Sequence, residues 1–213
     1  SPRGVPLFAA IIVGMCCRPL SGDDWPAYRH DPRGSGVSMD DIALPLVEVW
    51  AHRSAPPAVA WPELPATRDV FHRVERLLPT TDFDRAFQLS VAGGAVLYGS
   101  SSDDMVRCLD AAEGSVRWTF TADGPVRIAP VVADGRVYVC ADDGWVYCLR
   151  QGDGGLIWKY RGGPEERRLP GNGRMISLWP VRCGIVVDGG VAYFCAGLFP
   201  EHGAWLCADS GCG

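Results

Sequence analysis

The feature that most constrains this chain is an internal repeat. Residues 98–118 return as residues 138–158, a shift of 40 positions, and both copies carry a Cys-Leu pair, a Gly and a Trp at matching places. A period of about 40 residues with strand-rich content is typical of stacked four-stranded units. The repeat therefore predicts an all-β fold, a β-propeller built from four-stranded antiparallel blades.

Turn signals divide each copy into strands. In the second copy, Asp134-Gly135 and Asp142-Asp143-Gly144 separate runs rich in β-branched and aromatic residues, as hairpins require. The predicted strands of this copy cover residues 129–132, 136–140, 145–149 and 156–160. The copy before it spans about 87–120, and a third begins near residue 180. We expect residues 87–213 to hold about two full blades and a partial one, truncated in the last blade.

The N-terminal residues predict export. Residues 5–15 are an apolar run preceded by Arg3, too short to span a bilayer and close in length to the core of a secretory signal. Residues 1–22 are interpreted as a signal peptide whose basic start is clipped; the alternative is a buried apolar strand or helix. The signal places the protein in the periplasm or in association with the cell envelope, without a transmembrane helix.

Residues 23–86 do not repeat and are predicted to be irregular. Pro and Gly recur in residues 24–36 and 55–65, which disfavours helix there. Residues 46–50 form a short predicted strand whose Val-x-Val-Trp ending is similar to residues 116–118. We hypothesise that this strand is donated by the N-terminal segment to close the last blade of the ring.

Charge and cysteine usage exclude some functions. The net charge of −5 argues against nucleic-acid binding, which needs a clustered basic surface. None of the nine cysteines has C-x-x-C spacing, so no zinc or c-type haem motif is present in the sequence. Four cysteines fall inside predicted strands and are interpreted as small buried hydrophobes: Cys140, Cys148, Cys195 and Cys207. A disulfide between Cys183 and Cys195 is the alternative for an exported protein.

An insertion of about 20 residues separates the second and third copies. Residues 163–182 are predicted to be a loop, and insertions in repeat arrays often lie on the binding face. Arg174, Trp179 and Arg182 are the candidate ligand residues, because guanidinium groups and an aromatic ring suit an acidic or polar ligand. The alternative is a solvated loop without a ligand.

The repeated core resembles that of a known family. Asp110, Gly114 and Trp118 stand at the spacing Asp-x3-Gly-x3-Trp, and the second copy keeps Gly154 and Trp158. This pattern is similar to the repeat of bacterial quinoprotein-type β-propellers, the pyrroloquinoline quinone (PQQ)-like family, of which the chain resembles an N-terminal fragment. A turn Gly and an interblade Trp are structural features, so these five residues are predicted to hold the fold.

The resemblance implies two classes of function. Family members without redox activity are binding or scaffold modules outside the cytoplasm, which implies protein partners in the envelope or a small polar ligand. The dehydrogenases oxidise alcohols or sugars with PQQ and Ca²⁺, and carry adjacent cysteines over the quinone. Here the adjacent pair Cys16-Cys17 lies in the predicted signal, so we assign no catalytic or metal-binding residue and favour the scaffold. A third alternative is the propeller part of a larger enzyme with a catalytic domain beyond residue 213.

Overall fold

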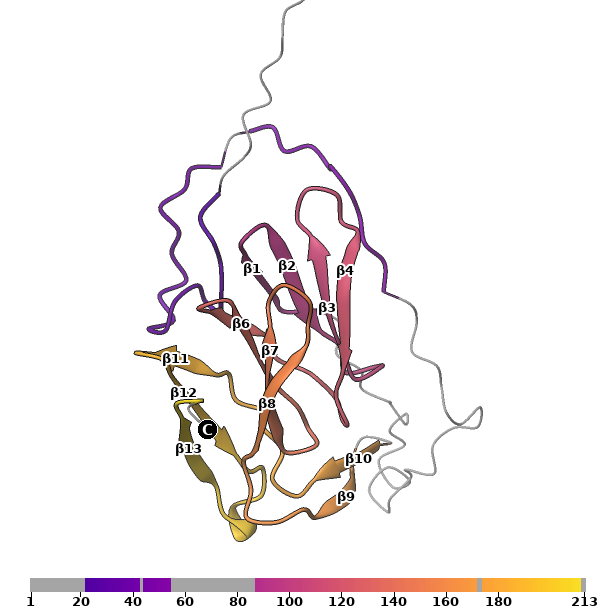
Figure 1. Cartoon of the computed structure of the whole chain (residues 1–213), viewed down its shortest axis with the longest axis vertical. Coiled ribbons are helices and arrows are strands. Elements are labelled where there is room, and N and C mark those ends of the chain that lie inside the picture. Colours follow the sequence, from indigo (N-terminus) through magenta and orange to yellow (C-terminus); the bar gives the residue numbers. More distant parts are fainter. Residues whose placement is uncertain (1–21, 43, 55–86, 172–173, 212–213) are drawn as a thin grey trace, which may run out of the picture.

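The computed structural model describes residues 22–42, 44–54, 87–171 and 174–211, and it confirms the predicted all-β fold (Figure 1). These residues form four separate antiparallel sheets and one short 3-10 helix, η1 (Pro200–His202). In the described residues, no helix is long and apolar enough to cross a membrane. The predicted signal peptide lies outside the described residues except for Gly22, as do residues 55–86.

Two complete four-stranded blades follow each other along the chain. The first contains β1 (Leu89–Ala92), β2 (Ala95–Gly99), β3 (Met105–Asp110) and β4 (Val116–Thr121). The second contains β5 (Val131–Ala133), β6 (Arg136–Cys140), β7 (Trp145–Arg150) and β8 (Leu156–Arg161). In each blade the strands are hydrogen-bonded in chain order. Each blade also has a register shift after its third-strand cysteine, Cys108 or Cys148, so the repeat extends to a local irregularity of the backbone.

A third sheet and a hairpin complete the described fold. The sheet contains β11 (Val186–Asp188), β12 (Val191–Ala196) and β13 (Trp205–Asp209). Where the sequence predicted a loop, β9 (Arg168–Gly171) and β10 (Arg174–Ser177) pair as an antiparallel hairpin. Leu169 faces Ile176 in this register; Ile176 is buried, and Leu169 packs against an apolar cluster. Burial of this pair stabilises strands that Pro and Gly disfavour.

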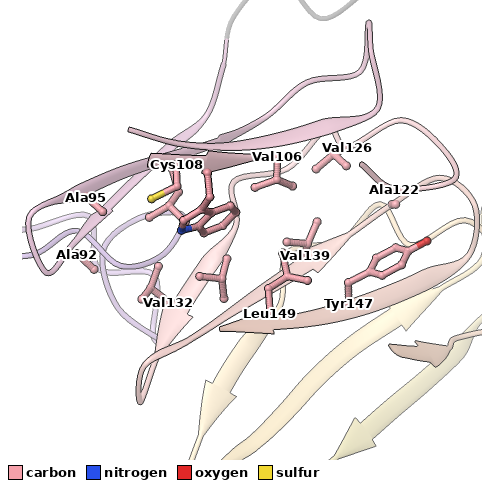
Figure 2. Packing of buried hydrophobic residues seen from close by; sticks show 14 residues of the cluster. Ala92, Ala95, Val106, Cys108, Ala122, Val126, Val132, Val139, Tyr147 and Leu149 are labelled. Carbon is pink, nitrogen blue, oxygen red and sulfur yellow. The ribbon is translucent and has the colours of Figure 1, made fainter. Parts of the chain in front are cut away.

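The apolar cores lie between the blades, because alternate residues of a strand point to opposite faces. In β6, Val137 and Val139 join the cluster shared with the first blade, shown in Figure 2. The intervening Tyr138 and Cys140 join the cluster shared with the third sheet. All four side chains are buried, which confirms that the second blade is packed on both faces. Its strands are apolar throughout for this reason.

The repeat tryptophans pack on the turn glycines of the next blade. A Cβ added at Gly154 would lie 2.5 Å from the ring of Trp118, and Gly154 has φ +71°. The Trp118 indole N–H also donates to the Gln151 carbonyl, at 2.8 Å. A side chain at residue 154 would therefore meet both a strained backbone and an occupied space. This contact explains the Gly and Trp of the repeat in structural terms.

Residues 46–50 have no strand assignment, but Trp50 repeats the same contact one blade earlier. A Cβ at Gly114 would lie 2.5 Å from the Trp50 ring, and the Trp50 indole N–H donates to the Ala111 carbonyl at 3.0 Å. Trp50 is thus placed against the first blade as Trp118 is placed against the second. The side chains of Leu46, Val47 and Val49 are exposed.

Residues near the start of the described chain form backbone contacts with the first strand of each blade. Trp25 forms a β-bridge with Val91 of β1, and the Val132 N–H of β5 donates to the Pro26 carbonyl at 2.8 Å. These two contacts connect the first strands of both blades through a segment that the sequence predicted to be irregular. They give β1 and β5 backbone hydrogen-bond partners on the edge that does not pair with β2 or β6.

Candidate functional site

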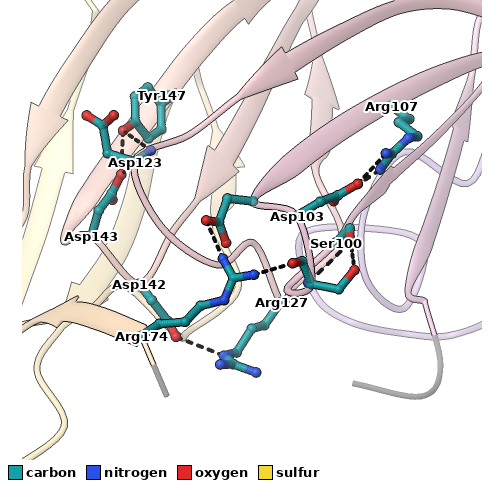
Figure 3. Close-up of polar contacts among 11 residues, drawn as sticks. Ser100, Asp103, Arg107, Asp123, Arg127, Asp142, Asp143, Tyr147 and Arg174 are labelled. Carbon is teal, nitrogen blue, oxygen red and sulfur yellow. Dashed lines mark hydrogen bonds and ion pairs between the residues drawn. The ribbon is translucent and has the colours of Figure 1, made fainter. Parts of the chain in front are cut away.

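Polar side chains gather where the turns between the second and third strands meet the connections between blades (Figure 3). The Asp142 N–H donates to the Pro125 carbonyl at 2.9 Å, and the Ser177 N–H donates to the Asp142 carbonyl at 2.7 Å. These backbone bonds join one turn to the β4–β5 connection and to the β9–β10 hairpin. We call the side chains here the polar cluster: Asp103, Asp104, Arg107, Arg127, Asp142, Asp143, Tyr147, Arg174 and Arg182.

Asp142 is the most buried member of the polar cluster, with 1% of its side chain exposed. The Arg182 guanidinium binds both of its carboxylate oxygens, at 2.8 and 2.7 Å. Arg127 donates to the same carboxylate at 2.8 Å. A buried carboxylate is costly unless it is paired and hydrogen-bonded, and two guanidinium groups satisfy that requirement here.

Asp143 is buried beside Asp142 and binds a different set of donors. Its carboxylate accepts the Tyr147 hydroxyl and the backbone N–H groups of Asp123, at 3.0 Å, and Trp145, at 2.9 Å. Burial raises the pKa of Asp143 above its usual value, although these hydrogen bonds oppose the shift. Burial, followed by the Asp143 charge, raises the pKa of Tyr147 as well, so the phenol stays a donor.

The first blade carries the related pair Asp103 and Asp104. Arg107 forms an ion pair with Asp103, in the position where the second blade has Tyr147 beside Asp143. Asp104 has φ +60° and forms an ion pair with Arg174 of the hairpin, which also donates to the Ser102 carbonyl. Burial raises the pKa of Asp104, and Arg174 opposes that shift. The Asp104 Oδ1 atom is buried without a hydrogen-bond partner.

The structure brings two of the three predicted ligand residues into the polar cluster. Arg174 and Arg182 both form ion pairs with aspartates of the blades. Trp179 is buried instead, and its indole N–H donates to the His202 carbonyl at 2.8 Å. Its ring covers Gly163, at which an added Cβ would lie 2.8 Å from Trp179 Cβ. The prediction that these residues bind a ligand stays a prediction.

Sequence reasoning missed the aspartates that bind these arginines. The available signal was the doublets Asp103-Asp104 and Asp142-Asp143, which follow the second strand of each blade. Asp142 and Asp143 were predicted to be turn residues, and the structure places them in a turn. Their second role depends on connections that come from other parts of the chain, and a local pattern does not reveal such contacts.

Replacing Arg174 with alanine is expected to destabilise the protein by about 1–2 kcal/mol at pH 7, because Asp104 loses its cation in a half-buried position. The loss should shrink as the pH falls from about 7 toward about 4, since protonated Asp104 no longer needs Arg174. Urea unfolding at both pH values measures this, with Asp104→Asn alone and in combination as the matched control. An equal loss at both pH values would contradict the ion-pair origin.

The polar cluster is suited to holding turns rather than to catalysis. Its aspartates bind arginines, a phenol or backbone N–H groups, and a general base or nucleophile needs a reactive atom open to substrate. Across the described ranges, no group of three or more His, Cys, Asp or Glu residues is placed to hold a metal ion.

Repeated four-stranded blades, an interblade Trp on a turn Gly and a cluster of structural ion pairs define a β-propeller of PQQ-like repeats. The family described as outer membrane protein assembly factor BamB matches residues 48–205. The chain belongs to this family.

Individual relatives match over shorter stretches. BamB from Yersinia pestis is 34% identical over 109 residues, which are 46% of this chain and 25% of that protein. The chain thus spans about a quarter of the length of this curated relative. The crystal structure of BamB from Moraxella catarrhalis covers 49% of this chain and 44% of its own, with 13% identity and a TM-score of 0.33. Quinohemoprotein alcohol dehydrogenase from Comamonas testosteroni covers 55% and 18%, with 18% identity and a TM-score of 0.43.

Proposed function

We propose that this chain is part of a non-catalytic propeller that serves as a binding or scaffold module in outer membrane protein assembly. The observation that carries the proposal is the family match over residues 48–205, which includes both complete blades and most of the third sheet. The ion-paired polar cluster supports it, because these bonds hold neighbouring connections in one arrangement. A rigid surface of this kind suits protein recognition, which needs little change of shape.

The proposed location is the periplasm or the cell envelope, and the proposed partners are proteins of outer membrane assembly. The apolar run at residues 5–15, with the length of a signal core, supports export. The relative from Yersinia pestis is an outer membrane protein assembly factor, which supports this class of partner. The net charge of −5 is consistent with a protein partner rather than with a nucleic acid.

Closure of the ring by the N-terminal segment belongs to the same proposal. Trp50 packs on Gly114 as Trp118 of the outer strand β4 packs on Gly154, which supports residues 46–50 as an outer strand of the blade before the first. The exposed side chains of Leu46, Val47 and Val49 suit a strand that pairs with a further blade. Closure of this kind removes open sheet edges from a propeller.

The experiment is capture of partners from living bacteria. The full-length protein, tagged at its C-terminus, is cross-linked in the source organism, purified from the envelope fraction and analysed by mass spectrometry. The matched control lacks residues 1–22 and should stay in the cytoplasm. We expect outer membrane assembly proteins with the intact protein and not with the control. Equal recovery of these partners with the control would contradict the proposal.

A second arm tests the absence of catalysis. The purified full-length protein is mixed with PQQ, Ca²⁺, alcohols or sugars, and a dye that accepts electrons. We expect no turnover above the rate without protein. Dye reduction that requires both PQQ and the protein would show a dehydrogenase instead.

A further inference from the structure

Two cysteines lie against each other in the third sheet. Cys183 belongs to the connection that leads from the β9–β10 hairpin into β11, and Cys195 belongs to β12. The Cys195 N–H donates to the Cys183 Sγ at 2.8 Å, and the Cys183 thiol donates to the Cys195 carbonyl at 3.0 Å. The Cys183 sulfur therefore contacts both the backbone nitrogen and the backbone oxygen of Cys195.

These contacts limit the distance between the two residues. The 2.8 Å contact joins Cys183 Sγ to the Cys195 nitrogen, which is one bond from the Cys195 Cα. Adding that bond and the span from a cysteine Sγ to its own Cα bounds the Cα–Cα separation at about 7 Å. Cysteines whose Cα atoms are more than about 7 Å apart cannot be bridged without moving the backbone, and this pair lies within that limit. Rotation of the side chains is the main adjustment that a bond requires.

The other cysteines of this region are less suited to either partner. Cys207 faces Phe194 in the register of β12 and β13, so it lies on the opposite face of the sheet from Cys195. Its sulfur is directed to the Gly162 carbonyl, at 3.5 Å. Cys140 is buried, and its thiol donates to the Cys183 carbonyl at 3.2 Å. Cys195 was predicted to be buried in its strand but is exposed, because its side chain points away from the cluster that Phe194 joins, so an external oxidant can reach it first.

We propose that Cys183 and Cys195 form a disulfide that ties the connection before β11 to β12. With a disulfide oxidant such as oxidised glutathione, the Cys195 thiolate attacks one sulfur and releases one glutathione thiol. The Cys183 thiolate then attacks the Cys195 sulfur of the mixed disulfide, releasing a second glutathione thiol and closing the bridge. Two protein thiols lose two protons and two electrons, and the oxidant is reduced to two thiols.

The bridge has a clear structural consequence. It closes a loop from residue 183 to residue 195 that contains β11 and the turn into β12. Cross-linking such a loop restricts the unfolded chain and stabilises the sheet. Burial raises the pKa of the Cys183 thiol, so the second step is expected to quicken as the pH rises. The bond would persist only in an oxidising compartment.

The experiment oxidises the purified full-length protein with glutathione disulfide, blocks the remaining thiols with an alkylating agent and maps the linked peptides by mass spectrometry. We expect a peptide pair joined through Cys183 and Cys195, and a loss of two free thiols per molecule in the monomer fraction. The melting temperature should fall by roughly 5–10 °C on reduction. Cys207→Ser, from the same sheet, should form the same bridge.

After oxidation, Cys195→Ser should keep one more free thiol than the wild type, because Cys183 then has no partner, and it should show no shift of melting temperature on reduction. A bridge from Cys195 to Cys207, or retention of both thiols in the oxidised wild type, would overturn the proposal. The same mapping on protein alkylated inside intact cells tests whether the bond forms in its natural compartment. The purified-protein test does not depend on export, so failure of the proposed function leaves its result unchanged.

Discussion

Replacing Trp118 with alanine is expected to destabilise the protein by about 3–5 kcal/mol, the cost of deleting a large buried aromatic side chain. Trp118 is 7% exposed and belongs to the apolar cluster between the first two blades. Its ring covers Gly154, and its indole N–H satisfies the Gln151 carbonyl. The alanine variant loses the interblade packing and the hydrogen bond together.

Urea unfolding of the wild type and the variant measures this loss. The slope of the free energy of unfolding against urea concentration should be the same for both, so that the difference in midpoint reports stability. Trp118→Phe is the matched control, because it keeps an aromatic ring in the interblade cluster while it removes the N–H and part of the ring area that covers Gly154. Its expected cost is smaller, about 1–2 kcal/mol. A loss below about 1 kcal/mol for the alanine variant would show that the Trp does not hold the blades together.

The repeat made most of the fold predictable. Residues 136–140 were expected to be a strand between two Asp-containing turns, and β6 has these bounds. The run Val137 to Cys140 is apolar on both faces of the strand, as a blade packed between neighbours requires, and Val137 and Tyr138 enter different clusters. Such features follow from local pattern and from a period that recurs, so a single sequence contains them.

The hairpin and the polar cluster depend on contacts that no local pattern contains. Pro170 and Gly171 disfavour a strand, yet β9 forms because Leu169 pairs with the buried Ile176 of β10. Arg182 was named as a candidate ligand residue; its ion pair with Asp142, which lies 40 positions away in the sequence, was not predicted. Packing of blades brings these groups together, and it overrides the local preference.

Replacing Asp142 with alanine is expected to destabilise the protein by about 3 kcal/mol, because removing one partner from a buried ion pair leaves the other charges unpaired. Asp142 is 1% exposed, and it binds both Arg127 and Arg182. Arg127 is the more buried arginine, with 15% of its side chain exposed, against 30% for Arg182. Arg182 can turn toward water more readily, which keeps the expected loss at the lower end for such pairs.

Asp142→Asn separates charge from shape. The amide is nearly the same size and still accepts a hydrogen bond, so the turn can keep its place while the charge is lost. We expect the free energy of unfolding of the asparagine variant to lie between the values for the wild type and the alanine variant. Arg182→Ala should cost less than Asp142→Ala, since Arg127 still pairs with the carboxylate. Urea unfolding of the three variants measures this order. If Asp142→Ala were as stable as the wild type, the arginines would not need the carboxylate. The polar cluster would then not hold the connections between blades.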